Sequence, residues 1–289
     1  MNKLLYTYIQ PLTDECFNKF RALIYKEAGI SMNDSKKALV ANRLRKRLLE
    51  LNLNRYEDYY KFITSPEGKI ELTNFIDAIS TNETYFFRGD NHFVAFKEVI
   101  LPELFKIRKE IKIWSAGCST GEEPYTIGIV ALEAIREYSW KGKISIIATD
   151  INSEVLKKAF EGRYSGRTLK FVPKEIISKY FNKLENNVYE VSDSVKRLVH
   201  FKRHNLLKDL PPGKNFDIIF CRNVMIYFDK LTQKKIVDIT FANALLRDGY
   251  LFIGHSESLI GKSQKFKYAN IMKAPIYRFK NIKQGQEEY

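Results

Sequence analysis

The chain has few of the residues that build metal centres and disulfide frameworks, with three cysteines and four histidines among 289 residues. Cys16, Cys118 and Cys221 lack the C-x-x-C spacing of zinc and redox motifs. The histidines are scattered, so each is predicted to be a packing or surface residue. We therefore expect no metal and no structural disulfide. Reduced thiols fit a cytoplasmic protein.

Long apolar runs and acidic residues are also in short supply. No apolar run approaches the roughly 20 residues that a membrane-spanning helix needs, so we expect no membrane insertion. The 34 acidic residues are outnumbered by 48 lysines and arginines, which gives a formal net charge of +14. That charge predicts an acidic partner. Nucleic acid, an anionic membrane surface and an acidic protein face all qualify, and charge alone does not choose among them.

Residues 1–78 have the apolar spacing of helices and are predicted to form a helical domain. The predicted helices cover residues 16–28, 31–51, 56–63 and 72–79. The second of them carries a basic cluster formed by Arg43, Arg45, Lys46 and Arg47, with no acid before Glu50. Charge runs usually form solvated faces. The lack of glutamate partners four residues away nevertheless favours a docking surface.

From residue 111 onward, predicted strands and helices alternate, which indicates a parallel sheet with helices on both faces. The predicted strands cover residues 111–114, 144–148, 198–201, 216–221 and 250–254, and the helices cover 124–138, 153–160 and 231–246, with a turn at 247–249. Between 163 and 197 the alternation stops, and segment 188–192 predicts one strand of a small antiparallel insertion. Segment 274–279 is a candidate for a last, antiparallel edge strand. We interpret 79–110 as a linker into a sheet domain that spans 111–289.

A turn pinched by Gly117 and Gly121 follows the first predicted strand and leads directly into Glu122 and Glu123. Glycines there allow the close backbone approach of a ligand. Paired carboxylates repel pyrophosphate but suit a ligand with a sugar, an ammonium and a sulfonium, and S-adenosylmethionine is the common cofactor of that description. Asp150 ends the next strand, at the edge where parallel sheets bind ligands. The turn alone is a weak signal, because many glycine pairs only join a strand to a helix.

Several longer segments together resemble the chemotaxis receptor methyltransferase family (CheR). The similar segments are residues 81–88 (TNETYFFR), 119–125 (STGEEPY), 149–151 (TDI), 221–228 (CRNVMIYF) and 254–257 (GHSE). The resemblance covers nearly the whole chain. It implies an α/β fold in which a Rossmann-like class I S-adenosylmethionine-dependent methyltransferase sheet carries an all-α N-terminal domain and a small antiparallel β-subdomain.

The resemblance implies an enzyme that transfers a methyl group from S-adenosylmethionine to glutamate side chains on the helical cytoplasmic bundle of bacterial chemoreceptors. The products would be glutamyl methyl esters and S-adenosylhomocysteine. It also implies a cytoplasmic monomer, recruited to chemoreceptor arrays at the inner face of the membrane, with no nucleic-acid partner. The implied cofactor-binding positions are Asn82, Thr84, Arg88, Gly117, Glu123, Asp150, Asn205, Leu206, Asn223 and Val224. In some family members the inserted subdomain grips the receptor's C-terminal tail, but loop 182–187 looks short and lacks glycines for that role.

Several of these residues also have a purely structural interpretation. Asp150 could cap the following helix, Asn82 could cap a turn, and Asn223 could stabilise only its own loop. The functional role is favoured for Asp150, whose carboxylate can accept both ribose hydroxyls, and for Glu123, which can face the cationic part of the cofactor. For Asn82 and Thr84, the preference for a functional role depends on the resemblance to the family.

The transfer needs no general base, because a glutamate side chain with a pKa of about 4.3 is already ionised at neutral pH. The enzyme must align oxygen, methyl carbon and sulfur, and such orientation can contribute roughly 7 to 11 kcal/mol. Arg88 and Tyr227 are the candidates, since a guanidinium can hold a carboxylate and a hydroxyl can orient the attacking oxygen. As alternatives, Arg88 could form an ion pair between the domains, and Tyr227 could be a core tyrosine beside Phe228. The basic cluster would steer the acidic receptor helices.

Two other functions stay open. An RNA methyltransferase fits the basic charge, but it should interleave base-stacking aromatics with the basic cluster, where Leu44 and Leu48 stand instead. A non-catalytic receptor-binding adaptor would hold S-adenosylmethionine only as a folding ligand. The presence of Arg88, Asp150 and Tyr227 together speaks against the adaptor.

Overall fold

The computed structural model describes residues 8–280, which divide into two compact units. The first contains the chain up to Thr81 together with Tyr227–Asp229, and the second contains Asn82–Ile226 and the chain from Lys230 onward. Within the described residues, no helix combines the length and the apolar character that crossing a bilayer requires.

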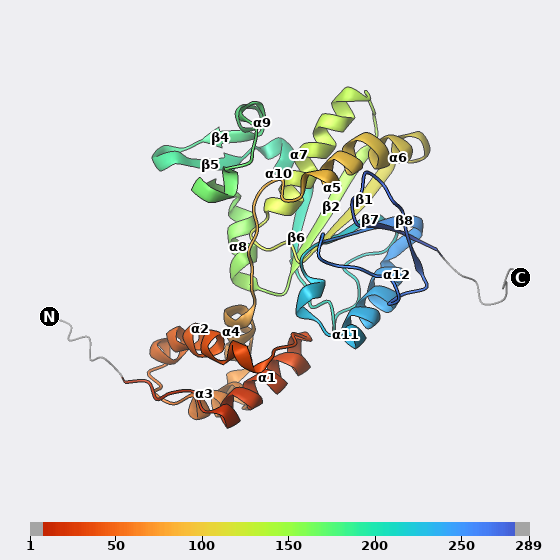
Figure 1. Cartoon of the computed structure of the whole chain (residues 1–289). Coiled ribbons are helices and arrows are strands. Elements are labelled where there is room, and N and C mark those ends of the chain that lie inside the picture. The colour runs from red at the N-terminus through yellow and green to blue at the C-terminus, as the bar shows by residue number, and fades with distance from the viewer. Residues whose placement is uncertain (1–7, 281–289) are drawn as a thin grey trace, which may run out of the picture. The chain divides into compact units, whose positions relative to one another are not determined.

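The helical unit, coloured red to orange in Figure 1, confirms the four predicted helices. They are α1 (Asp14–Ala28), α2 (Lys37–Glu50), α3 (Tyr56–Ile63) and α4 (Lys69–Ile79). The Thr13 hydroxyl caps α1 by accepting the Cys16 N–H at 3.2 Å, and Gly29 ends it with φ 73°. A 3₁₀ turn, Asp34–Lys36, precedes α2, so α2 begins a few residues later than predicted.

Three residues from far along the chain complete the helical unit. The Ser31 N–H donates to the Tyr227 carbonyl at 2.8 Å, and the Tyr25 hydroxyl donates to the Asp229 carboxylate at 2.8 Å. The unit's own apolar residues pack around Phe20, whose ring lies 5.6 Å from that of Phe75.

The second unit is built on a seven-stranded sheet with the order β6-β2-β1-β7-β8-β10-β9. Its strands are β1 (Glu110–Ala116), β2 (Lys143–Asp150), β6 (Val199–Arg203), β7 (Phe216–Cys221), β8 (Leu245–Ile253), β9 (Phe266–Tyr268) and β10 (Ile276–Phe279). The first five strands in the sheet order are parallel, as predicted. β10 is antiparallel as predicted, but β9, which was not predicted, forms the edge beyond it.

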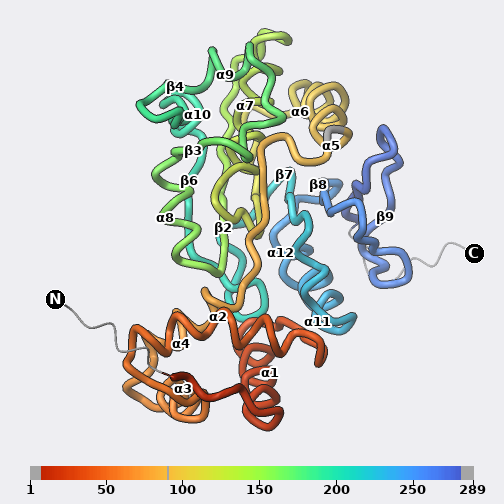
Figure 2. The backbone as a smooth tube through the Cα atoms, turned by 60° about the vertical axis from the view of Figure 1, so that its left-hand side comes forward, coloured from red at the N-terminus to blue at the C-terminus, as the bar shows by residue number. Residues whose placement is uncertain are grey.

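The segment 230–253 departs from prediction in the form of its helix and in the start of the strand that follows. The predicted helix 231–246 is a continuous helix made of α11 (Lys230–Lys235), a π-helical segment (Ile236–Phe241) and α12 (Ala242–Ala244), visible in Figure 2. β8 already begins at Leu245, so the predicted turn at 247–249 lies inside an irregular strand. The helices α7 (Glu122–Glu137) and α8 (Ser153–Glu161) agree with prediction.

The segment that we interpret as a linker, 79–110, contains helices that the sequence analysis does not predict. Residues 90–107 form α5 (Asp90–Ala95), a π-helical segment (Phe96–Ile100) and α6 (Leu101–Ile107). The cause is apolar burial, because Phe93, Phe96, Ile100 and Leu104 follow helical spacing and all lie in the core of the unit.

The antiparallel insertion is confirmed. Its sheet has the order β3-β5-β4, formed by β3 (Arg163–Ser165), β5 (Val188–Val191) and β4 (Phe181–Lys183), and α9 (Lys174–Tyr180) leads into β4. The ring of Phe86 packs edge-on against Tyr164 at 4.8 Å and Phe181 at 5.2 Å. Through Phe86, the insertion therefore packs against the segment 82–88, which is part of the resemblance to the family.

Candidate functional site

The carboxyl ends of β1, β2, β7 and β8 meet at one edge of the sheet, because these strands are parallel neighbours. Asp150 is the last residue of β2, and the loops that follow β1 and β7 contain Gly117, Asn223 and Val224. Hydrogen bonds connect these loops to one another within the second unit, while the role of their residues in cofactor binding stays a prediction.

The glycine turn after β1 is as constrained as predicted. Gly117 has φ 84°, and a Cβ there would lie 2.4 Å from the Val224 Cγ2 atom. Gly121 has φ 95°, and its Cβ would lie 2.9 Å from that of Ala159. Both positions therefore require glycine for conformation and for space. Gly117 also brings the loop after β1 against the loop after β7.

Asp150 at the end of β2 is buried and held in a fixed orientation. Its Oδ2 accepts the Ser119 N–H at 2.8 Å, and its Oδ1 accepts the Asn152 N–H at 2.9 Å. The side chain of Asn152, not that of Asp150, caps α8, by accepting the N–H groups of Glu154 and Val155. The structural interpretation of Asp150 as a helix cap is thus wrong. Each carboxylate oxygen can accept more than one hydrogen bond, which suits the binding of hydroxyl groups.

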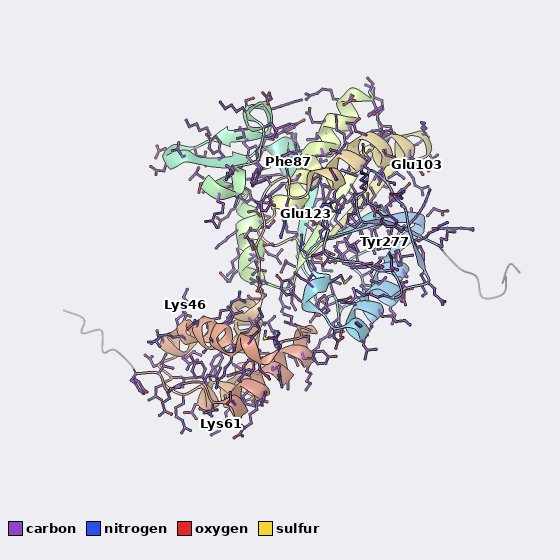
Figure 3. The ribbon with its side chains drawn as sticks, viewed as in Figure 1. Lys46, Lys61, Phe87, Glu103, Glu123 and Tyr277 are labelled. Carbon is purple, nitrogen blue, oxygen red and sulfur yellow. The ribbon has the colours of Figure 1, made fainter. Side chains whose placement is uncertain are left out.

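Glu123, labelled in Figure 3, forms a buried ion pair with Arg222. Its Oε1 accepts the Ser115 hydroxyl at 2.8 Å, and the Arg222 Nη1 donates to its Oε2 at 3.1 Å. Burial raises the pKa of Glu123, and the Arg222 guanidinium and the Ser115 hydroxyl oppose that rise. Burial also raises the pKa of Glu122, whose carboxylate accepts the Thr120 hydroxyl at 2.6 Å.

Arg222 is the main site residue that the sequence analysis did not single out. Its side chain is 3% exposed, and its guanidinium lies 5.2 Å from the Phe93 ring. Besides Glu123, it donates to the main-chain carbonyl of Arg88. The position of Arg222, directly before the predicted Asn223, was a signal in the sequence. The direction of its side chain depends on the tertiary structure and could not be predicted.

The segment 82–88 is fixed to this site mainly through its backbone. The Asn82 carbonyl accepts the Ser119 hydroxyl at 2.9 Å, and the Arg88 carbonyl accepts from Arg222. The Arg88 side chain donates from Nη1 to the Glu83 carbonyl at 2.8 Å and lies 5.6 Å from the Tyr85 ring. Thr84 is half-buried in the same segment. The structure thus brings Asn82 and Arg88 to the site, while their contacts with a ligand stay predictions.

The loop after β6 is joined to Asp150. The His204 N–H donates to the Asp150 carbonyl at 2.9 Å. In the next residue, the Asn205 Oδ1 accepts the Leu207 N–H at 3.0 Å, and the Leu206 carbonyl accepts the Thr240 hydroxyl at 3.3 Å. Asn205 and Leu206 therefore lie in a loop that is hydrogen-bonded to the end of β2, and their contact with a cofactor stays a prediction.

Tyr227 and the basic cluster belong to the helical unit. Within that unit, Arg43 donates to the carbonyls of Ile79 and Ser80, and Arg47 pairs with Glu71 at 2.6 Å. The inference from missing glutamate partners was therefore wrong for Lys46 and Arg47, because Glu50 on α2 pairs with both and α4 supplies Glu71 to Arg47. Arg45 and Lys46 are exposed, and Figure 3 shows Lys46 on α2. The Lys46 Nζ lies 3.7 Å from Glu50.

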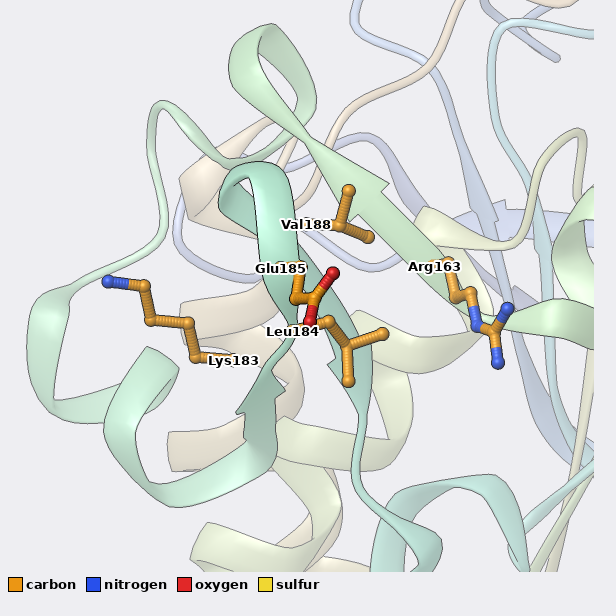
Figure 4. Close-up of a pocket in the computed structure, with 5 residues that line it drawn as sticks. All are labelled: Arg163, Lys183, Leu184, Glu185 and Val188. Atoms are coloured by element: carbon orange, nitrogen blue, oxygen red, sulfur yellow. The ribbon is translucent and has the colours of Figure 1, made fainter.

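An open hollow of about 740 Å³ lies in the insertion, away from the sheet edge (Figure 4). It is lined by Arg163, Lys183, Leu184, Glu185 and Val188. It contains none of the predicted cofactor-binding residues. The buried carboxylates and the glycine turn lie instead at the carboxyl ends of the parallel strands.

The residues at the sheet edge fit S-adenosylmethionine. Asp150 presents a fixed carboxylate for ribose hydroxyls, and Gly117 leaves room for close backbone approach. Glu123 places negative charge at the start of α7, where a phosphate-binding turn would keep free N–H groups. The turn itself, 117–121, contains no lysine. This arrangement favours a ligand with hydroxyls and positive charge over a pyrophosphate.

Comparisons with known proteins identify the family to which the chain is similar. A family model described as CheR methyltransferase, SAM binding domain, matches residues 82–274, and one described as CheR methyltransferase, all-alpha domain, matches residues 15–80. A chemotaxis protein methyltransferase of Borreliella burgdorferi is 40% identical over 256 residues, covering 86% of this chain and 90% of the relative. One from Salmonella typhimurium is 39% identical over 261 residues, covering 88% of each chain.

Proposed function

Because the chain belongs to the CheR methyltransferase family, we propose that this S-adenosylmethionine-dependent chemotaxis enzyme methylates glutamate side chains of chemoreceptors. The products would be glutamyl methyl esters on the helical cytoplasmic part of the receptor. The observation that carries the proposal is the pair of oriented, buried carboxylates, Asp150 and Glu123, at the carboxyl edge of the sheet.

Cofactor binding is the first task of the chain's own residues. Asp150 would accept the ribose hydroxyls, and its orientation is set in advance by the N–H groups of Ser119 and Asn152. Glu123 would face the cationic end of the cofactor, with Arg222 balancing its charge. Asn205, Asn223 and the 82–88 segment would complete the cavity. When bound, S-adenosylmethionine supplies an electrophilic methyl group on a sulfonium.

Alignment is the second task, and it is where Arg88 and Tyr227 are proposed to act. A receptor glutamate is ionised at neutral pH, so the chain needs to position its carboxylate and not to deprotonate it. The Arg88 guanidinium would hold a carboxylate, after exchanging its contact with the Glu83 carbonyl. The Tyr227 hydroxyl would orient the attacking oxygen.

Receptor docking is proposed for the basic cluster on α2. Arg45 and Lys46 are the exposed members of that cluster, so they are the ones able to meet acidic receptor helices directly. Arg43 and Arg47 would act by holding α2 against α4.

The decisive experiment is methyl transfer from labelled S-adenosylmethionine to a chemoreceptor cytoplasmic fragment. We expect the label to be released by mild base, because esters hydrolyse whereas N-methyl groups and methylated bases do not. A base-stable label on the protein, or a label on added RNA, would contradict the proposal. No transfer despite tight cofactor binding would instead support a receptor-binding adaptor.

Replacing Asp150 tests the cofactor site directly. Each hydrogen bond to a charged group is worth about 1.5–3 kcal/mol, so losing two in Asp150→Ala should weaken cofactor binding by about a hundredfold or more. Calorimetry on the purified variant measures this. Glu154→Ala, which removes an exposed acid from α8, is the matched control and should leave affinity unchanged. An unchanged affinity in Asp150→Ala would remove Asp150 from the site.

A further inference from the structure

The turn that follows β8 contains a buried carboxylate with an unusual set of donors. Glu257 is 9% exposed. Its Oε2 accepts the Asn223 N–H at 3.0 Å and also the Gly254 N–H, and its Oε1 accepts the Ile226 N–H at 3.2 Å. One side chain thus satisfies three backbone N–H groups, two of them in the loop after β7. These bonds join the loops that follow two neighbouring strands.

The loop after β7 needs such support. Asn223 has φ 59°, a left-handed conformation that costs free energy in a residue with a side chain. The Cγ2 atom of Val224, the next residue, would lie only 2.4 Å from a Cβ atom added at Gly117. The backbone position of this loop therefore sets how Asn223 and Val224 meet the glycine turn.

The junction between the two loops has no spare room. A Cβ on Gly254 would lie 2.8 Å from the Asn223 Nδ2 and 2.8 Å from the Glu257 Oε2. The amide side chain of Asn223 is therefore packed directly against the turn that Glu257 closes. Any shift of the Glu257 carboxylate would move the Asn223 backbone with it.

We propose that Glu257 is a positioning residue for cofactor binding, which acts by holding Asn223 and Val224 in their binding conformation. The inference rests on the proposed role of those two residues in the cofactor site. Glu257 itself needs no contact with the cofactor. Its effect would reach the cofactor through backbone N–H groups, so it belongs to the site although it lies on a different loop.

Two substitutions separate this role from general stability. Glu257→Gln keeps the size of the side chain but replaces one acceptor oxygen with an NH₂ group, which cannot accept from a backbone N–H. Asp217→Asn is the matched control, because Asp217 is also a buried carboxylate that accepts a backbone N–H, from Lys112 at 2.9 Å. Asp217 lies at the start of β7, at the edge of the sheet opposite Asn223. Both variants should lower the unfolding temperature.

Only Glu257→Gln should weaken cofactor binding. We expect its dissociation constant for S-adenosylhomocysteine to rise about tenfold and the KM for S-adenosylmethionine to rise with it, while kcat changes less than twofold. Amide hydrogen exchange at Asn223 and Ile226 should accelerate in Glu257→Gln and not in Asp217→Asn. An affinity within twofold of the wild type in Glu257→Gln, or an equal loss in Asp217→Asn, would overturn the proposal.

The outcome can be told apart from a failure of the proposed function. If the wild-type protein does not bind S-adenosylhomocysteine, the cofactor site itself is misassigned. If the wild type binds it and Glu257→Gln binds it equally well with faster amide exchange, the site stands and only the positioning role falls.

Discussion

Gly117 lies where Val224 leaves no room for a side chain, and its φ of 84° is itself unfavourable for other residues. Gly117→Ala should therefore combine backbone strain of about 1–3 kcal/mol with displacement of the loop after β7. Because that loop carries Asn223, we expect cofactor affinity to fall as well as stability. Titration calorimetry and thermal unfolding measure the two effects.

Gly166 provides the control for that substitution. It has φ 57°, but nothing lies within 4 Å of a Cβ added there. Gly166→Ala should show the backbone strain alone and keep the wild-type cofactor affinity. Equal affinity losses in the two variants would argue against a specific contact between Gly117 and Val224.

Among single residues, the sequence allowed prediction of those whose position along a strand defines their role. Asp150 is the last residue of β2 and Glu123 lies in the first turn of α7, the helix after β1, so their place near the carboxyl ends of the strands could be inferred from the alternation of strands and helices. Arg222 and Glu257 could not be assigned in this way. Their partners, Glu123 on α7 and Asn223 on the loop after β7, lie far away in the sequence, and spacing along the chain does not indicate them.

Helix α2 presents two kinds of basic residue, and they should respond differently to mutation. Arg45 and Lys46 are exposed, so the double variant Arg45→Glu/Lys46→Glu should raise the apparent KM for the receptor and leave cofactor affinity intact. The defect should be largest at low ionic strength, because salt screens exposed charges. Steady-state methylation assays at two salt concentrations test this.

The matched control is Lys61→Glu/Lys69→Glu, which makes the same change in net charge on exposed residues of α3 and α4. Lys61 is labelled in Figure 3. If both double variants raise the receptor KM equally, the effect is one of overall charge and not of docking by α2. Identical kinetics for wild type and Arg45→Glu/Lys46→Glu at low salt would refute the docking role.

Whole elements were predictable where their apolar pattern is long. The helices of the first unit and the parallel strands of the second follow from periods of 3.6 residues and from buried runs. β9 has only three residues, too few to show a period. Residues 90–107 were not predicted as helices, although Phe96 and Ile100 follow helical spacing and are buried in the core of the second unit.

At the scale of the whole molecule, acid should destabilise the second unit through His92. This histidine is 0% exposed, its Nε2 lies 2.8 Å from the Ile253 carbonyl, and burial, Arg222 and His255 lower its pKa to about 3. An unfolded histidine has a pKa of about 6.5, so the unfolded state binds an extra proton between these values. The contribution of His92 to stability is complete above pH 6.5 and is lost as the pH falls toward 3.

The size of this effect can be measured against His92→Gln, which cannot take up the proton. Between pH 7 and pH 5 the wild type should lose about 2 kcal/mol more unfolding free energy than the variant does. Urea unfolding followed by tryptophan fluorescence reports on the second unit, since Trp114 and Trp140 both lie in it. Parallel pH profiles for the two proteins would show that His92 is not the titrating group.

The hydrogen bond from Tyr25 to Asp229 spans 204 residues, yet both ends belong to the helical unit. During synthesis, α1 to α4 leave the ribosome long before the residues that complete their surface. A fragment that stops at Thr81 would thus lack part of its own unit, including the acceptors of the Ser31 and Tyr25 hydrogen bonds. The residues that complete the N-terminal helical unit are in this way made only after strands β1, β2, β6 and β7 of the large sheet.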